Sequence, residues 1–194
     1  GFHVVSEKGT YTADALVSSA PIGTIYKMLT GEDAGLQSLD LLTLYVSADT
    51  LDDRTGNVLY NFSREGAWKR ATIYSRIYPE LGSGQAFFSV EITVPLNGTS
   101  DAEMEFDAVK KHFEAVGLGQ GLRLEGSAYT PQCYPLYRVG EGERIKRVID
   151  RVTEAGVVTI GRQGRFEYLP TASGVIRRVG QELEEQSLLR PALI

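Results

Sequence analysis

The stretch LDLLTLYVSA, residues 39–48, alternates between apolar and more polar side chains, and this alternation is the main basis of the fold prediction. Successive side chains of a strand point to opposite faces, so this alternation predicts a half-buried strand. One predicted face is apolar and carries Leu42, Leu44, Val46 and Ala48, whereas the other carries Thr43, Tyr45 and Ser47. Such a strand belongs to a sheet with one face on a core and one polar face.

Three neighbouring stretches read as further strands: residues 57–63, 69–78 and 86–94. They are joined by short connections such as DDRTG and ELGSG, which predicts an antiparallel meander. Helical patterns follow at residues 100–119, 140–156 and 173–186, with one more strand that ends at Pro135. The expected fold class is therefore α+β: a mainly antiparallel sheet with one polar face, packed by helices on the other.

The local signals add detail at both ends of the pattern. The first residues read as a hairpin around Lys8 and Gly9, with residues 4–5 and 15–17 as its strands. In the helix at 100–119, Ser100 is the expected N-cap and Glu103 completes a capping box. The expected apolar stripe of that helix consists of Met104, Ala108, Val109, Phe113 and Val116.

The amino-acid composition indicates which classes of protein are compatible with the sequence. Hydrophobic residues make up 42% and charged residues 23% of the 194, as in an ordinary globular protein. The net charge of −5 argues against a nucleic-acid partner. No apolar run is long enough for a membrane span and no secretion signal is present, so a cytoplasmic location is expected.

Metal and thiol chemistry find little support in the sequence. His3 and His112 are isolated, and one cysteine, Cys133, cannot complete a zinc site with them. A buried structural thiol is a better interpretation of Cys133 than a nucleophile, because no histidine is placed to activate it. We therefore expect neither a metal site nor a catalytic residue in this chain.

The polar face of the predicted sheet is the first positive signal for binding. If the strand at 69–78 is continuous, Tyr45, Tyr74, Arg76 and Tyr78 project from one side. Tyrosine offers a ring with a polar tip, and arginine offers a fork that suits phosphate or carboxylate. This face is either a binding surface or an ordinary amphipathic sheet that another element covers.

The second signal is the segment GVVTIGRQGRFEYLPTASGVIRRVGQEL at residues 156–183. A short apolar strand leads into Gly161 and Arg162, and a helix follows. Glycines allow a ligand close to the backbone, and arginine and a helix N-terminus favour an anion. The alternative is a tight turn in which Arg162 forms a structural ion pair.

Two blocks and a helix, in order, resemble the flavin-dependent amine oxidase superfamily, nearest its UDP-galactopyranose mutase and protoporphyrinogen oxidase-like branch. YTADALVSSAPI, residues 11–22, is similar to the family's late "aDaVIstaPl" stretch. CYPLYRVGEGERIKRVIDRVTEAGVVTIGRQGRFEYL, residues 133–169, looks like its "YPvy…GR.G.f.Y" return to the FAD domain. The helix near Ser173 follows, whereas the family's G-x-G-x-x-G fingerprint is absent. The resemblance implies the C-terminal, substrate-domain portion of a two-domain FAD/NAD(P)-binding flavoprotein.

The resemblance also implies roles for individual residues. Arg162 would reach the FAD pyrophosphate and Gly161 would permit that approach; Tyr168 and Phe166 would lie at the pocket, and Pro21 would bound the flavin ring. The family often has NMD or DMD after the tyrosine, but here the acidic residue is missing and Thr171 or Ser173 is the expected helix cap. The cofactor-binding set is Gly161, Arg162, Tyr168, Thr171 and Pro21, and the substrate-binding set is Tyr74, Arg76, Tyr45, Tyr134 and Phe166.

The sequence thus predicts residues 1–30 as the edge of a missing FAD domain, 31–136 as a substrate-binding α+β domain, and 137–194 as a return segment. We expect an FAD-dependent oxidoreductase or mutase-like protein, inactive without its N-terminal half, that acts on a small, anionic or nucleotide-sugar substrate. A second copy could cover the exposed sheet face. The alternative is a stand-alone, non-enzymatic α+β module that binds a ligand or protein through the Tyr/Arg face.

Overall fold

Two units make up the chain, as seen in a computed structural model that describes residues 1–81, 84–94 and 98–188. Unit 1 combines Gly1–Gln37 with the described part of Pro135–Ile194, and unit 2 is the continuous segment Ser38–Tyr134. No described helix has the length and apolar character that a membrane crossing needs. Each unit has its own hydrophobic core.

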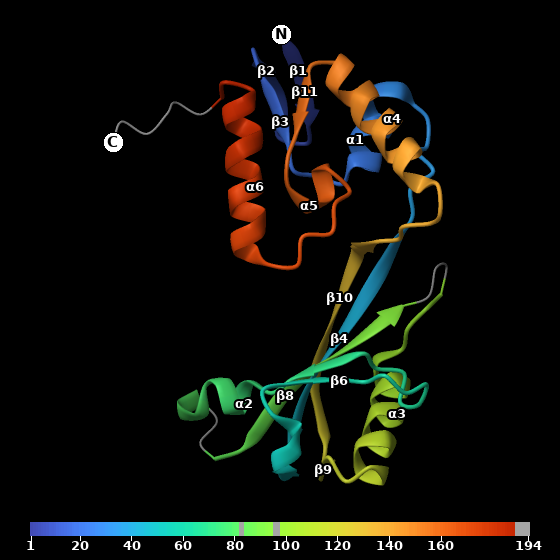
Figure 1. Cartoon of the computed structure of the whole chain (residues 1–194), viewed down its shortest axis with the longest axis vertical. Helices are drawn as coiled ribbons and strands as arrows, with labels where there is room; N and C mark the ends of the chain where they lie inside the picture. The colour runs from blue at the N-terminus through green and yellow to red at the C-terminus, as the bar shows by residue number, and fades with distance from the viewer. Residues whose placement is uncertain (82–83, 95–97, 189–194) are drawn as a thin grey trace. The chain divides into compact units, whose positions relative to one another are not determined.

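Unit 2 is built on a five-stranded sheet with the order β10-β4-β8-β7-β6 (Figure 1). The pairs β4–β8, β8–β7 and β7–β6 are antiparallel, which confirms the predicted fold class. The meander holds only for β6, β7 and β8, because β4 pairs with β8 and not with β6. The elements are β4 (Ser38–Ala48), β5 (Thr50–Leu51), η1 (Asp53–Thr55), β6 (Val58–Tyr60), β7 (Arg70–Thr72), α2 (Tyr74–Ile77), η2 (Pro79–Leu81), β8 (Ala86–Val94), α3 (Ala102–Ala115), β9 (Gly119–Gln120) and β10 (Arg123–Pro135).

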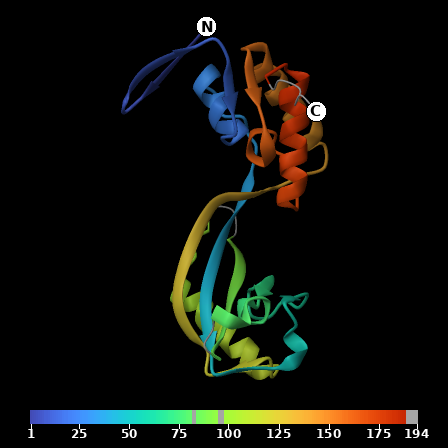
Figure 2. The same cartoon turned by 90° about the vertical axis from the view of Figure 1, so that its left-hand side faces the viewer.

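The apolar face of this sheet is buried as the alternation predicts. Leu44 lies opposite Val90, and Val90 lies opposite Ala71, so three strands contribute to one row. All three side chains are fully buried. Helix α3 supplies the other half of the core. Figure 2 shows the long strands β4 and β10 side by side in the sheet.

Helix α3 differs from its prediction in two respects. Asp101, and not Ser100, is the N-cap: its side chain accepts a hydrogen bond from the Met104 N–H. The buried stripe is Phe106, Val109 and Phe113, whereas the Met104 side chain is 70% exposed. Phe106, Val109 and Phe113 recur at the i, i+3 and i+7 spacing of one helix face, and Met104 falls outside that face.

The predicted strand at residues 69–78 is wrong beyond Thr72. Strand β7 ends there, Ile73 is buried, and α2 begins at Tyr74. The Arg76 guanidinium donates to the carbonyl oxygens of Asp52 and Asp53, which holds the chain in this turn. The alternation of apolar and polar residues in the sequence therefore continues beyond Thr72, where the strand itself ends.

Unit 1 contains eight described elements that come from both ends of the chain. They are β1 (Phe2–Ser6), β2 (Gly9–Ala13), β3 (Leu16–Ser18), α1 (Ile22–Thr30), α4 (Glu141–Glu154), β11 (Val157–Thr159), α5 (Gly161–Gly164) and α6 (Ala172–Glu185). Its core consists of Ile22, Val148, Val152, Val157 and Phe166. Helix α4 presents Val148 and Val152 to that core, as its periodicity predicts.

The first hairpin uses different strands from those predicted. Strand β1 pairs with β2, and its register, with Phe2 opposite Ala13 and Ser6 opposite Gly9, is complete by residue 13. Residues 16–18 instead form β3, which pairs in parallel with β11. The prediction was wrong because the partner of β3 lies at the far end of the sequence.

Candidate functional site

The turn after β11 is the centre of the candidate site in unit 1. Gly161 has a left-handed φ of +72°, which lets the chain leave the strand and enter α5. A Cβ at Gly164 would lie 2.8 Å from the Ser18 carbonyl oxygen, so only glycine permits this packing of α5 on the chain after β3. Both glycines therefore allow segments of the protein to pack closely against each other, which is not the approach of a ligand to the backbone.

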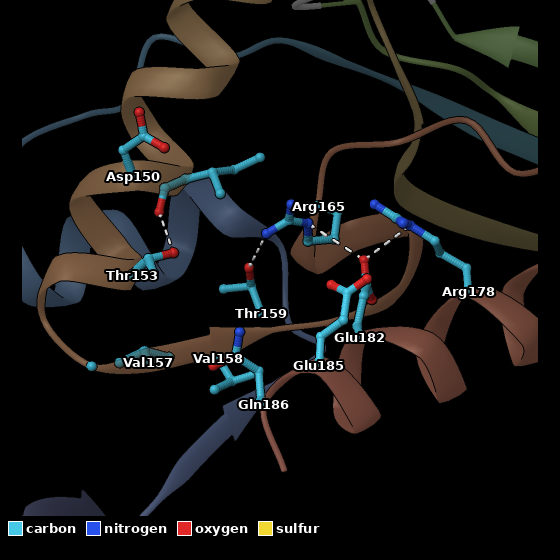
Figure 3. Close-up of a pocket in the computed structure, with 12 residues that line it drawn as sticks. Asp150, Thr153, Val157, Val158, Thr159, Arg165, Arg178, Glu182, Glu185 and Gln186 are labelled. Carbon is cyan, nitrogen blue, oxygen red and sulfur yellow. Dashed lines mark hydrogen bonds and ion pairs between the residues drawn. The ribbon is translucent and has the colours of Figure 1, made fainter. Parts of the chain in front are cut away.

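A buried carboxylate connects this turn to α6. Glu182 accepts a hydrogen bond from the Gly161 N–H at 3.4 Å, and its Oε1 lies 3.5 Å from Arg165 Nε and 3.2 Å from Arg178 Nε. The Glu182 side chain is 8% exposed. Figure 3 shows Arg165 and Arg178 both pointing toward it. Glu182 thus fixes the backbone of the turn against α6, a contact that the sequence pattern did not indicate.

The loop after α5 gathers the aromatic residues predicted for the pocket. The Arg162 guanidinium lies 5.7 Å from the centre of the Tyr168 ring, a cation–π distance. The Tyr137 hydroxyl donates to the Phe166 carbonyl oxygen at 2.9 Å and accepts from the Tyr168 N–H at 2.8 Å. The structure therefore brings Arg162, Phe166 and Tyr168 together, with Tyr137 as a positioning residue that sequence reasoning missed.

Thr171 and Pro21, two residues of the predicted cofactor-binding set, stand at helix N-termini that are formed differently. Thr171 caps α6, and its hydroxyl accepts from the Gly174 N–H, as predicted for Thr171 or Ser173. Pro21 stands at the N-cap position of α1, where no side chain caps the helix. Thr171 is therefore engaged in its own helix, while Pro21 is followed by an N-terminus without a side-chain cap.

The unit fits an anionic cofactor at Arg162 better than at Gly161. The Gly161 N–H already donates to the Glu182 carboxylate, so an anion at this N–H would meet a negative charge. Arg162 is half-buried and is held beside the Tyr168 ring, which presets its direction. Of the two residues at the turn, Arg162 is thus the one suited to a phosphate group.

Strand β11 has one edge that pairs with no other strand among the described residues. Its parallel partner β3 lies on one side, where Ile160 N–H donates to the Ser18 carbonyl oxygen at 2.9 Å. Because N–H groups alternate along a strand, those of Val157 and Thr159 point to the opposite edge. A cavity of about 330 Å³ lies beside β11. Its lining includes Thr153 of α4, Glu185 of α6 and residues 157–159 (Figure 3).

In unit 2 the predicted tyrosine and arginine side chains do not share one face. Tyr45 projects from the polar face and is 47% exposed. Tyr74 and Arg76 lie on α2, outside the sheet, and Arg76 is bound to η1 and the residue before it. Tyr134 is on β10, where its ring lies under the Lys69 ammonium group at 3.8 Å.

Other residues give the polar face the character that was expected of it. The register places Thr43, Glu91, Arg70 and Tyr60 in one row across β4, β8, β7 and β6. Arg70, and not Arg76, is therefore the arginine of this face. The sequence KRATIYSRIY does place Arg70 on the same face as Arg76, because an even number of residues separates them. Alternation alone could not show that the strand ends before Arg76.

Comparison with known proteins gives a match in structure only. No protein-family model matches the chain, and no curated protein matches it in sequence. Among solved structures, that of reduced UDP-galactopyranose mutase matches with a TM-score of 0.77 and 14% identity. A protoporphyrinogen oxidase-like protein of an Exiguobacterium species has a TM-score of 0.63 and 16% identity, and an oxidoreductase of Methanosarcina mazei 0.57 and 13%.

The matches cover 94–96% of this chain but only 44–45% of those three chains. The chain thus spans less than half the length of the structures that it resembles. This result confirms the predicted resemblance at the level of the fold: the chain folds as a portion of a UDP-galactopyranose mutase or protoporphyrinogen oxidase-like chain does.

Proposed function

We propose that this chain is the C-terminal, substrate-binding portion of an FAD-dependent oxidoreductase or UDP-galactopyranose mutase-like protein. The observation that carries the proposal is the fold match over 96% of this chain and 44% of the mutase chain. The portion is proposed to be inactive until an N-terminal, dinucleotide-binding half joins it. FAD would supply the redox chemistry, and the protein would supply binding and orientation.

The open edge of β11 supports the incompleteness of unit 1. Parallel strands are normally covered on both faces and paired on both sides within a larger sheet. Among the described residues, β3 and β11 form a parallel sheet of two strands, although Val157 and Thr159 are almost fully buried. A further strand from the preceding part of the protein would pair with the Val157 and Thr159 backbone and fill the cavity beside it.

Within this proposal, Arg162 is the main residue of the predicted cofactor-binding set. Arg162 would hold the FAD pyrophosphate, beside Gly161, Tyr168, Thr171 and Pro21. Substrate contacts in unit 2 would come from Tyr45, Tyr74 and Tyr134, whereas Arg76 is engaged with the carbonyl oxygens of Asp52 and Asp53. The contacts around Tyr137 support a shared position for Phe166 and Tyr168, since one hydroxyl binds the backbone of both.

The first experiment is a comparison of colour. The full-length protein is expected to purify with bound flavin and its visible absorption bands, whereas the 194-residue chain alone is expected to be colourless. Absorbance of the two preparations, before and after added FAD, measures this. A full-length protein that neither carries nor takes up FAD would refute the proposal.

The second experiment tests Arg162 in the full-length protein. Arg162→Ala removes the proposed phosphate contact, and a charge-assisted contact of this kind corresponds to a loss of about tenfold or more in FAD affinity. Arg177→Ala is the matched control, because Arg177 is exposed on the neighbouring helix α6. Equal FAD dissociation constants for the two variants would exclude Arg162 from the cofactor site.

A second candidate function is a stand-alone binding module that uses the sheet face. It is favoured by the half-exposed rings of Tyr45 and Tyr60 on the polar face, where Tyr60 lies opposite Arg70. The sequence that precedes Gly1 in the gene discriminates the two candidates: a G-x-G-x-x-G fingerprint after a strand supports the flavoprotein. A start codon directly before Gly1 supports the module.

A further inference from the structure

A tryptophan and a histidine of unit 2 are joined by a hydrogen bond between their side chains. Trp68 Nε1 lies 3.0 Å from His112 Nδ1, and the centroids of the two rings are 5.9 Å apart. Trp68 ends the loop that follows β6, residues 61–68, which is called the Trp68 loop below. His112 belongs to α3, 44 residues further along the sequence. This bond therefore attaches the Trp68 loop to the helix that covers the apolar face of the sheet.

The chemistry of the two rings decides which protonation state of His112 makes this bond. An indole nitrogen only donates, so the imidazole has to accept. A neutral imidazole has one acceptor nitrogen, whereas an imidazolium has two N–H donors and no acceptor. Turning the ring over does not help, because it exchanges one N–H group for the other. The bond from Trp68 and a positive charge on His112 therefore exclude each other.

No counter-charge beside His112 stabilises its protonated form. The positions three and four residues away on α3 and at its end are apolar: Ala108, Val109, Ala115 and Val116. Lys111 and Glu114 point to other sides of the helix, and the face of the sheet beneath α3 is apolar. The Trp68 loop carries Arg64 and Glu65, both exposed. Among the described residues, neither of them forms an ion pair with His112.

The Trp68 loop is seated directly on the imidazole and is under backbone strain. A Cβ on Gly66 would lie only 2.7 Å from His112 Nδ1. Ala67 has a left-handed φ of +57°, a conformation that is costly for any residue other than glycine or asparagine. At the start of the loop, the Asn61 side-chain amide donates to the Trp68 carbonyl oxygen at 2.9 Å. The loop is thus closed at its base by Asn61 and held on α3 by His112.

We propose that His112 is a proton-sensitive latch for the Trp68 loop: the neutral imidazole holds the loop on α3, and the imidazolium releases it. The Trp68 side chain is 4% exposed, so release leaves a buried N–H group without an acceptor and loosens the strained loop. The loop carries Phe62, which is 94% exposed and stacks on Tyr60 of the edge strand β6. Acid therefore changes the surface at this edge of unit 2, whatever the function of the whole protein.

The direction of the pH effect follows from the form that makes the bond. Only neutral His112 accepts from Trp68, so the latch is closed at high pH and opens as the pH falls. Histidine side chains titrate between about pH 8 and pH 5, which is the interval in which the loop is expected to respond.

The indole N–H itself provides the measurement, because the chain has one tryptophan. Trp68 gives one indole signal in a two-dimensional ¹H–¹⁵N NMR spectrum of the 194-residue chain. Its protection from solvent exchange is expected to fall about tenfold or more from about pH 8 to about pH 5, with a change in chemical shift. Circular dichroism at both pH values separates release of the loop from unfolding of unit 2.

His112→Asn is the decisive variant. Its amide oxygen replaces Nδ1 as an acceptor for the indole N–H but does not titrate, so protection of the Trp68 signal is expected to be the same at both pH values. His3→Asn is the matched control, because it removes the other histidine of the sequence and lies on β1 in unit 1. The Trp68 signal of this control is expected to follow pH as in the unchanged chain.

A second measurement needs no substitution of His112. Long-range ¹H–¹⁵N spectra show which imidazole nitrogen carries the proton, and His3→Asn assigns the remaining ring to His112. At high pH the proton is expected on Nε2, since Nδ1 accepts from Trp68.

Three results would overturn the inference. The first is an equal response to pH in folded His112→Asn and in the unchanged chain, because another group, such as Glu65, would then be the one that titrates. The second is a folded, unchanged chain whose Trp68 protection does not depend on pH. The third is a neutral His112 with its proton on Nδ1, which remains measurable even if His112→Asn does not fold.

Discussion

Replacement of Phe113 by alanine is expected to lower the free energy of unfolding of unit 2 by about 3–5 kcal/mol. The Phe113 side chain is fully buried, 5.5 Å from the Phe88 ring and 5.1 Å from the Trp68 ring between centroids. Removing it leaves a cavity between α3 and the sheet. A domain of this size is usually stable by roughly 5–15 kcal/mol, so the loss is a large part of the total.

The lone tryptophan makes this prediction measurable in one unit. Trp68 is the chain's single tryptophan and contacts Phe113, so its fluorescence in a urea titration reports the unfolding of unit 2. Met104→Ala is the control on the same helix, because the Met104 side chain is 70% exposed. Phe113→Leu, which conserves more volume, should cost about 1 kcal/mol.

The comparison of the two alanine variants decides the outcome. If Phe113→Ala and Met104→Ala shift the urea midpoint by the same amount, α3 does not pack on the sheet through Phe113. If Phe113→Ala fails to fold, Phe113→Leu still separates the two possibilities, because only a packed position responds to the change of shape.

Replacement of Glu182 by alanine is expected to destabilise unit 1 by about 3 kcal/mol, since removing one partner of a buried ion pair leaves the others uncompensated. Arg165 and Arg178 would lose an ion-pair partner, with Glu167 left as the partner of Arg178, and the Gly161 N–H would lose its acceptor. The turn that carries Arg162 would lose its attachment to α6. Hydrogen exchange, read by mass spectrometry over α5 and α6, should become faster.

Glu184→Ala provides the control for this substitution. Glu184 lies two residues further along α6 and is exposed, so its removal changes the charge of the helix without opening a buried pair. Exchange in α5 that is equally fast in both variants would contradict the role given to Glu182. Glu182→Gln is expected to lie between them, because an amide oxygen still accepts from the Gly161 N–H.

The sequence was sufficient wherever a local pattern decided the structure. Alternation located β4 and β8 and assigned their buried faces, because burial on one face of a sheet imposes a period of two. Periodicity located α4, α6 and the general extent of α3. The resemblance in two short blocks, with a helix after them, located the fold of the whole chain, which the structural matches confirm.

The sequence was insufficient wherever a distant contact decided the structure. Alternation ran on past Thr72, but the bonds from Arg76 to Asp52 and Asp53 turn the chain out of the sheet. Residues 16–18 read as part of a hairpin, yet their partner β11 lies at residues 157–159. Contacts between separate elements also explain why the sequence did not indicate the role of Glu182 or the ion pair of Lys69 with Glu91. Neither contact follows from the spacing of residues within one helix or strand.

The pairing of β3 with β11 has a consequence for biosynthesis. Leu16 lies opposite Val157, so the two partners are 157 − 16 = 141 residues apart. A ribosome therefore releases the whole of residues 38–134 before β11 exists, and the continuous middle segment has the opportunity to fold first. Strand β3 must wait for β11, which makes closure of this parallel pair a slow, non-local step of folding.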